Sequence, residues 1–171
     1  MNRKLTLILM GISLLACNFL FPQAQRSTPD SVDFQDPQPT GFTIVRLHPN
    51  NGDLPTMLAE EAKKADALGQ MPVVEFDATW CPPCQAIDQA ITANNELMLN
   101  VYAETYIIRL DVDEWGWDDS KLHDFQFDAI PVYFKLDSVG KQTGDVIDGG
   151  AWDEDVPENI APVMGEFFHG D

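Results

Sequence analysis

The stretch that decides the fold is Met71 to Ala86, MPVVEFDATWCPPCQA. Its segment Pro72 to Phe76 is a short apolar run, rich in Val and closed by a loop, which predicts a buried strand. The residues after Cys84 have the pattern of a helix, so the two cysteines lie where a strand passes into a helix. Unpaired N–H groups and partial positive charge at a helix N-terminus favour a thiolate, the reactive form of cysteine. We therefore expect Cys81 to be the reactive sulfur.

Length and composition favour a single small domain with a tail. The chain has 171 residues and three cysteines, Cys17, Cys81 and Cys84, and a chain of this length can bury a core without a disulfide scaffold. A bond between Cys81 and Cys84 would close a very short loop and add little stability. The pair is therefore better suited to a chemical role than to stabilising the fold. The formal charge of −18 repels phosphate backbones, so we expect no nucleic-acid partner, and we expect a monomer.

Residues 1–16 have the layout of a secretory signal, because a basic start precedes the apolar run Leu5 to Ala16. The run ends in Leu14-Leu15-Ala16-Cys17, which resembles the lipobox of bacterial lipoproteins. That resemblance implies cleavage before Cys17 and a lipid anchor on this cysteine. The alternative is an uncleaved anchor, since Leu5 to Phe21 reaches the lower length limit for a membrane-spanning helix. Both interpretations predict a membrane-anchored protein whose domain lies outside the cytoplasm.

The rest of the chain divides into a tether, residues 17–41, and a domain, residues 42–171. The tether is predicted to be flexible because Pro22 to Gly41 is rich in Pro, Gln, Ser, Thr and Asp. Apolar periodicity and turn residues predict strands over 42–47, 72–76, 106–112, 130–136 and 142–147. The same signals predict helices over 53–69, after Cys84 to about Asn94, from Glu96, over 118–125 and over 154–168. Strands that alternate with helices indicate an α/β fold with a parallel core, and Pro162 should kink or split the last helix.

The order of elements, the motif Trp80-Cys81-Pro82-Pro83-Cys84 and the Ile130-Pro131 pair together resemble the thioredoxin family. The resemblance covers about residues 42 to 168. It is strongest to extracytoplasmic thioredoxin-like proteins, including the C-terminal domain of the membrane thiol:disulfide interchange reductases. It implies a central mixed sheet of four to five strands flanked by helices.

The resemblance implies roles for both cysteines and for a proline. Cys81 matches the exposed nucleophile and Cys84 the buried resolving cysteine, which would close a disulfide with Cys81 after attack on a substrate. Pro131 matches the family's cis-proline, which faces the sulfurs and leaves the backbone of Ile130 free to pair with an extended peptide. An ordinary proline at a strand start is the alternative for Pro131.

Glu75 lies six residues before Cys81, where the family commonly has a buried acid that moves protons for the resolving cysteine. A carboxylate inside an apolar strand should have a raised pKa, which suits a proton acceptor for Cys84. A solvated position at the sheet edge is the alternative. Arg109 matches a basic position near that acid, or it faces solvent.

Several neighbouring residues are expected to shape the substrate site. We expect Trp80, Pro82, Pro83 and Ile130 to contact substrate, and Pro82 departs from the glycine of cytoplasmic thioredoxins. Gln85 replaces a common basic residue. Two pairs of residues each have two alternatives. Trp115 and Trp117 either flank the site or pack in the core. Gly149 and Gly150 either lie close to a bound peptide or form a plain turn.

These features predict an extracytoplasmic thiol-disulfide oxidoreductase that reduces protein disulfides and receives electrons from a membrane thiol:disulfide interchange protein. No cofactor and no resident metal are expected. One alternative is a dithiol oxidase or isomerase. Another is a Cu(I)-binding module that uses Cys81 and Cys84, whereas zinc would need more ligands than the scattered histidines His48, His123 and His169 offer.

Overall fold

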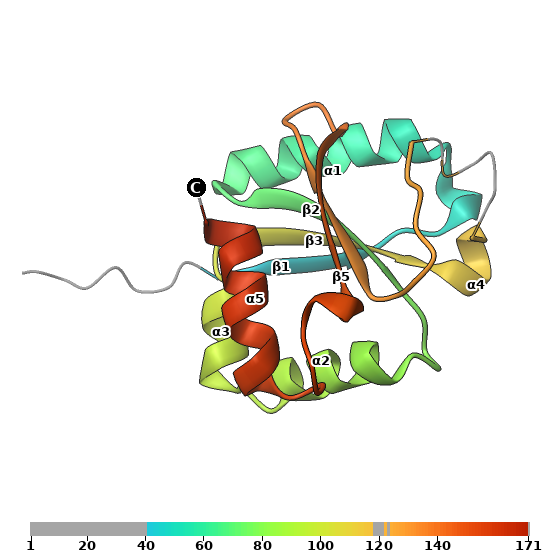
Figure 1. Ribbon diagram of the computed structural model, residues 1–171. Helices are drawn as coiled ribbons and strands as arrows, with labels where there is room; N and C mark the ends of the chain where they lie inside the picture. The colour runs from blue at the N-terminus through green and yellow to red at the C-terminus, as the bar shows by residue number, and fades with distance from the viewer. Residues whose placement is uncertain (1–40, 118–121, 123, 171) are drawn as a thin grey trace, which may run out of the picture. The chain divides into compact units, whose positions relative to one another are not determined.

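The computed structural model describes residues 41–117, 122 and 124–170, which form an α/β fold (Figure 1). The strands are Thr43–Arg46 (β1), Met71–Asp77 (β2), Thr105–Asp111 (β3), Val132–Leu136 (β4) and Gln142–Asp148 (β5). The α-helices are Leu54–Leu68 (α1), Pro82–Thr92 (α2), Glu96–Tyr102 (α3), Val112–Trp115 (α4) and Pro157–His169 (α5), and Pro49–Asn51 (η1) and Gly149–Ala151 (η2) are short 3-10 helices.

The strands form one mixed sheet of five strands in the order β1-β3-β2-β4-β5. Strands β1, β3 and β2 run parallel, while β4 runs antiparallel to β2 and β5 antiparallel to β4. The predicted fold class is confirmed. The register places Arg46, Arg109, Glu75 and Tyr133 in one row across the first four strands of that order.

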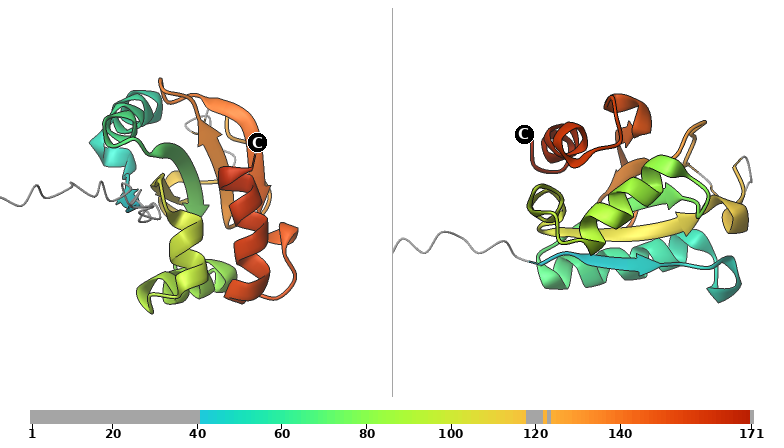
Figure 2. Two further views of the ribbon diagram at one scale, coloured as in Figure 1. Left: turned by 90° about the vertical axis from the view of Figure 1, so that its left-hand side faces the viewer. Right: turned by 90° about the horizontal axis from the view of Figure 1, so that it is seen from below.

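Helices cover both faces of the sheet. Helix α1 lies on one face and α2, α3 and α5 lie on the other, as Figure 1 and both views of Figure 2 show. Because successive residues of a strand point to opposite faces, Phe76 of β2 packs in the cluster that contains Leu58 of α1. Val73 of β2 packs instead with Ile87 of α2. Both faces of the central strand are therefore buried.

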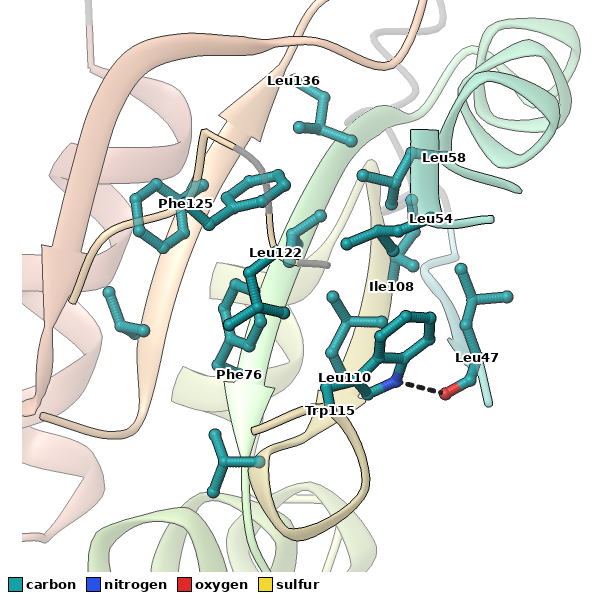
Figure 3. Packing of buried hydrophobic residues seen from close by; sticks show 14 of the residues in the cluster. Leu47, Leu54, Leu58, Phe76, Ile108, Leu110, Trp115, Leu122, Phe125 and Leu136 are labelled. Carbon is teal, nitrogen blue, oxygen red and sulfur yellow. Dashed lines mark hydrogen bonds between the residues drawn. The ribbon is translucent and has the colours of Figure 1, made fainter. Parts of the chain in front are cut away.

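Trp115 belongs to the core on the α1 side. Its side chain is buried, and its Nε1–H donates to the carbonyl oxygen of Leu47 at 3.1 Å (Figure 3). The bond joins α4 to the segment that follows β1. Of the two alternatives for this tryptophan, core packing is the observed one.

Local signals placed the first helix correctly. Asp53 is the N-cap of α1 and accepts a hydrogen bond from the backbone N–H of Thr56 at 3.1 Å, as expected of an aspartate cap. The helix ends at Gly69, whose φ of 66° is in the left-handed region that glycine adopts without a steric penalty.

Several boundaries differ from the prediction, and three of them lie close to the motif or to the strands beside it. Helix α2 begins at Pro82 rather than after Cys84, because proline already has a helical φ and needs no N–H partner in the first turn. Strand β4 begins at Val132 rather than at Ile130. Val112 starts α4 instead of ending β3, because the side chain of Asp111 caps a short helix there.

Pro162 does not split the last helix. Helix α5 runs without interruption through this residue to His169. A proline inside a helix removes one backbone hydrogen bond and crowds the preceding turn. Burial of Ile160, Met164 and Phe168 against the sheet and α3 offsets that cost.

Two groups of predictions lie on residues that the structure does not describe. The signal segment, Cys17 and the tether up to residue 40 fall outside the described residues, and so does most of the helix predicted over 118–125. Among the helices that are described, none combines the length and the apolar character that crossing a membrane requires.

Candidate active site

The two cysteines of the motif lie at the junction between β2 and α2. Cys81 is the N-cap of α2, and its Sγ accepts a hydrogen bond from the backbone N–H of Cys84 at 3.3 Å. The two sulfurs are joined in a disulfide, with Cα atoms 5.3 Å apart. One helical turn therefore brings the two sulfurs together at a helix N-terminus.

The expected difference in exposure between the two cysteines is not observed. Cys81 is 1% exposed and Cys84 is 4% exposed, so the prediction of an exposed Cys81 is wrong for this disulfide state. The Sγ of Cys81 is bonded to Cys84 and lies 3.7 Å from the carbonyl oxygen of Ile130. The segment before β4 therefore covers the sulfur.

The Ile130–Pro131 peptide bond is cis, as the resemblance implies. Gly149, the first residue of η2, lies beside this bond, and its N–H donates to the carbonyl oxygen of Pro131 at 2.9 Å. A Cβ on Gly149 would lie 3.1 Å from Pro131 Cδ, closer than an ordinary contact. Gly149 thus lets the start of η2 pack closely on Pro131.

Glu75 is buried, so the alternative of a solvated edge is wrong. It is 1% exposed, its Oε2 accepts from Arg109 Nε at 2.7 Å, and its Oε1 accepts from the Tyr133 hydroxyl at 2.9 Å. Burial raises the pKa of Glu75, although Arg109 and Tyr133 act in the opposite direction. A raised pKa makes the Glu75 carboxylate a stronger proton acceptor.

Arg109 joins the sheet to α2. Its Nη2 lies 2.6 Å from Oδ1 of Asp88, which lies one helical turn after Cys84 and so on the same side of α2. Burial lowers the pKa of Arg109, but the charges of Glu75 and Asp88 outweigh this and raise it. The guanidinium therefore stays charged, and the alternative in which it faces solvent is wrong.

A second buried acid follows Glu75 on the same face of β2. Asp77 is 4% exposed, and its two oxygens accept from Arg46 Nη1 and Nη2 at 2.8 and 2.6 Å. Arg109 Nε lies 4.0 Å from Asp77, and the charge of Asp77 also raises the pKa of Glu75.

Aromatic side chains lie beside Cys81. Trp80 is 54% exposed, and its Nε1–H donates to Asp113 Oδ2 at 2.9 Å. Its ring stacks on Trp117, with centroids 6.5 Å apart, and Trp117 in turn packs against Phe127 at 5.7 Å. Trp117 therefore flanks the site, unlike the buried Trp115.

The prolines of the motif leave few donors at the helix start. Pro82 and Pro83 occupy the first two positions of α2 and have no N–H. Gln85 uses its Nε2–H₂ to bond the carbonyl oxygen of Thr79 at 2.5 Å, so it fixes the loop and adds no charge. Within the described residues, no three His, Cys, Asp or Glu side chains gather as a metal site.

Sequence reasoning missed Tyr133, Asp88 and the Arg46–Asp77 pair. Asp88 could have been found from its spacing of four residues after Cys84, because such residues share a helix face. Asp77 could have been found from its spacing of two after Glu75. Tyr133 meets Glu75 only through the pairing of β2 with β4, which local patterns do not contain.

Comparison with known proteins agrees with this geometry. The family model for thioredoxin matches residues 57–161, which include both cysteines, Glu75 and Pro131. The chain is similar to thioredoxin H4 of Arabidopsis thaliana, at 28% identity over 124 residues that cover 71% of this chain and 91% of the relative. It is also similar to thioredoxin H2 of Arabidopsis thaliana, at 33% identity over 53% of this chain and 61% of the relative. A solved structure of a disulphide isomerase from Xylella fastidiosa Temecula1 aligns with 68% of this chain and 89% of its own, at 20% identity and a TM-score of 0.48.

Proposed function

This chain belongs to the thioredoxin family of thiol-disulfide oxidoreductases, and we propose that it reduces disulfide bonds of other proteins outside the cytoplasm. The observation that carries the proposal is the Cys81–Cys84 disulfide at the start of α2, with the carbonyl of the cis Ile130–Pro131 bond 3.7 Å from Cys81 Sγ. A Cys81–Cys84 bond that can open and close next to the backbone of Ile130 suits thiol exchange with a disulfide of another protein.

In the proposed reaction, the dithiol form of the protein is the reductant. The Cys81 thiolate attacks one sulfur of a substrate disulfide, and the other substrate sulfur leaves as a thiolate that takes up a proton. The Cys84 thiolate then attacks Cys81 Sγ, releases the second substrate thiol and closes the Cys81–Cys84 bond. Two electrons pass from the protein to the substrate in each cycle.

We assign Glu75 the role of proton acceptor for Cys84. Its raised pKa supports this role, since a carboxylate with a raised pKa is a stronger acceptor for the thiol proton. The Arg109 bridge from Glu75 to Asp88 supports it too, because it ties the carboxyl to the helix that carries Cys84. We expect Trp80, Pro82, Pro83 and Ile130 to contact the substrate.

The proposed location and electron donor rest on the sequence. A lipid on Cys17 would anchor the protein to a membrane through residues 17–41. An oxidised protein outside the cytoplasm needs a reductant there, and by family analogy we propose a membrane thiol:disulfide interchange protein.

An insulin-reduction assay tests the activity. Cys81→Ser and Cys84→Ser should each abolish turnover, and Cys84→Ser should also trap substrates as mixed disulfides on Cys81, visible on non-reducing gels. Wild-type activity in either variant would overturn the proposal. The direction is tested by equilibrating the pair with glutathione buffers, because a potential as high as that of strong oxidants would favour an oxidase.

A second experiment tests the location separately. The full chain and a Cys17→Ala variant are expressed with their native N-terminus in a bacterium, and membranes are separated from soluble proteins. We expect wild type in the membrane fraction with its N-terminal residues 1–16 removed, and Cys17→Ala retaining them. Equal processing of both proteins would contradict lipidation at Cys17.

A further inference from the structure

Two grooves flank Pro162 on the outside of the last helix. Helix α5 lies beside α3 in Figures 1 and 2, and a groove of about 460 Å³ between them is lined by Leu97, Glu158 and Pro162 among others. A second groove, of about 500 Å³, lies between α5 and β5, and Pro162 lines it together with Val146, Glu166 and Phe167. We define the α5 surface by the residues Leu97, Val146, Glu158, Pro162, Glu166 and Phe167.

The α5 surface exposes large apolar side chains. Leu97 in the first groove is 44% exposed and Val146 in the second is 52% exposed. Burial of such side chains in a partner removes apolar area from water and is favourable. Among the described residues, neither groove is lined by α2 or by the Ile130–Pro131 segment. The α5 surface is therefore separate from the disulfide site.

Pro162 is an unfavourable residue for its position in the fold. It is exposed and lies in the interior of α5, where proline is the least favourable of all residues for the helix. It also has no N–H to donate to the carbonyl oxygen of Glu158 one turn earlier. Since the exposed ring adds little to the core, the departure from helix rules is of the kind found at functional positions. The Glu158 carbonyl is left as an acceptor between the two grooves.

The charge around both grooves is negative. Residues 96–102, 142–148 and 157–169, which are α3, β5 and α5, contain no Lys or Arg and five acidic residues: Glu96, Asp145, Asp148, Glu158 and Glu166. Glu158 and Glu166 are exposed and form no ion pair with any residue that the structure describes. Lys135 of β4 is held over the ring of Phe167, with its Nζ 5.1 Å from the ring centre. A basic partner is therefore complementary to the two unpaired glutamates.

The spacing of these glutamates specifies the form of the partner. Glu158 and Glu166 lie eight residues apart on α5 with Pro162 midway between them, which is about 12 Å along the helix axis. Lys or Arg residues seven or eight positions apart on a second helix have nearly the same separation and lie on one face of it. Apolar residues three and four positions after the first basic residue share that face and can enter the grooves.

We propose that the α5 surface is a docking site for an amphipathic helix of a partner protein, whose apolar side chains fill the two grooves and whose Lys or Arg residues pair with Glu158 and Glu166. The Glu158 carbonyl accepts a hydrogen bond from the same partner. A second copy of this chain, with its formal charge of −18, and an anionic membrane would both be repelled. The proposal does not depend on the proposed reduction of disulfides, because the α5 surface shares no residue with that site.

The test uses synthetic peptides and the full chain. The probe is a fluorescein-labelled helical peptide of Ala and Gln that carries two Arg seven positions apart and two adjacent Leu midway between them. A second peptide has Glu in place of both Arg. Anisotropy titrations measure the affinities, and backbone amide shifts in NMR spectra locate the bound peptide. We expect the Arg peptide to bind more tightly than the Glu peptide and to shift amides of α3, α5 and β5.

Charge reversal provides the decisive comparison. Glu158→Lys/Glu166→Lys should weaken binding of the Arg peptide roughly tenfold, since two surface ion pairs are lost and replaced by repulsion. The same variant should bind the Glu peptide more tightly than wild type does. The matched control is Glu60→Lys/Asp66→Lys, which makes the same change in net charge at two exposed acids of α1 and should retain binding of the Arg peptide.

Pro162→Ala separates docking from stability. This variant restores an N–H for the Glu158 carbonyl and removes the ring, so it should raise the temperature of thermal unfolding and weaken binding of the Arg peptide. A proline with a purely structural role would not produce a more stable protein that binds less well. Tighter or unchanged binding in Pro162→Ala would therefore remove this residue from the proposed site.

Four results would overturn the docking site. The first is equal affinity of the Arg peptide for wild type and Glu158→Lys/Glu166→Lys. The second is an equal loss in the α1 control, which would show attraction by net charge alone. The third is a set of amide shifts centred on Trp80 and Cys81. The fourth is a different occupant, seen as a dimer in sedimentation or as binding to phosphatidylcholine vesicles, either of which is lost in Leu97→Ala/Val146→Ala.

Discussion

At the scale of single residues, the prolines of the motif limit the N–H donors available to Cys81. Its sulfur accepts the N–H of Cys84 at 3.3 Å, the third helix position, while Pro82 and Pro83 supply no N–H at the first two. An N-cap side chain ordinarily accepts from the second or third position. The Cys81 thiolate is therefore less stabilised than it would be with an N–H at position 83.

Pro83→Ala should lower the pKa of the Cys81 thiol in the reduced protein by about half a pH unit, since an N-terminal charge interaction is worth about 0.3–1 kcal/mol. Pro82→Ala should lower it less, because the first N–H faces away from the cap. Thiolate absorbance in the ultraviolet, followed across pH, measures the change. Pro55→Ala, a proline in the first turn of α1, is the control that should have no effect, and an unchanged Cys81 pKa in Pro83→Ala would contradict the argument.

Tyr133 contributes to the proton affinity of Glu75, after burial and the charges of Arg109 and Asp77. Its hydroxyl donates to Glu75 Oε1 at 2.9 Å and so opposes the rise in the pKa of Glu75 that burial causes. Burial and the charge of Glu75 raise the pKa of Tyr133 itself, so the hydroxyl keeps its proton and remains a donor.

Tyr133→Phe should raise the pKa of Glu75 further. If ionised Glu75 accepts the proton of Cys84, the acidic limb of the pH–rate profile for insulin reduction moves to higher pH. Tyr102→Phe is the matched control, because Tyr102 bonds the Tyr133 hydroxyl at 3.2 Å, whereas the hydroxyl that donates to Glu75 is that of Tyr133. The shift of the acidic limb should be smaller for Tyr102→Phe than for Tyr133→Phe. Identical pH–rate profiles for wild type and Tyr133→Phe would exclude Glu75 as the proton acceptor.

Several of these residues could be identified from sequence. Cys81 and Cys84, with Trp80 before them and the Ile130-Pro131 pair after them, carry the resemblance to the thioredoxin family, and that resemblance implied the disulfide and the cis bond. Tyr133 could not be predicted, because its contact with Glu75 depends on the register of strands far apart in the chain.

At the scale of elements, local signals found strands and helices but not all of their limits. Alternation, caps and turn residues predicted the central strands and α1, because these signals lie within a few residues of each boundary. The uninterrupted α5 was not predicted, since its continuity through Pro162 depends on packing of Ile160 and Met164. Burial of Cys81 also depends on the covering segment at Ile130, which is distant in sequence.

The turn between β4 and β5 packs tightly against α1 through Gly140. This residue has a φ of 83°, and a Cβ there would lie 2.6 Å from the backbone of Leu58. Gly140→Ala should therefore combine backbone strain with a clash and lower the free energy of unfolding by about 2–4 kcal/mol.

Gly69→Ala is the matched control for Gly140→Ala. Gly69 has a φ of 66°, but a Cβ added there would meet open space. Gly69→Ala should therefore lower the free energy of unfolding only by the backbone strain, about 1 kcal/mol. Urea unfolding of both variants measures the difference. Equal losses would show that the contact between the β4–β5 turn and α1 is not a tight one.

At the scale of the whole molecule, two effects make stability depend on pH. The formal charge of −18 produces repulsion that grows as surface carboxyls ionise, and salt screens it. Glu75 acts differently because it is buried and its pKa is raised in the folded state. The folded protein therefore holds this proton more tightly than the unfolded chain. The contribution of Glu75 to stability is fully present below the unfolded pKa and is lost as pH rises through the folded pKa.

Salt and one substitution should separate these effects. In oxidised protein, where the cysteines do not titrate, the free energy of unfolding should fall with rising pH from about 4.3 upward, with a contribution from Glu75 of at most about 1.4 kcal/mol per pH unit. High salt should remove the part due to surface repulsion and leave the part due to Glu75. Glu75→Gln should remove that remaining slope, whereas Glu61→Gln, a change at another buried carboxyl, should retain it. A slope at high salt that is the same in wild type and Glu75→Gln would contradict the raised pKa of Glu75 in the folded protein and so remove the support it gives to Glu75 as proton acceptor.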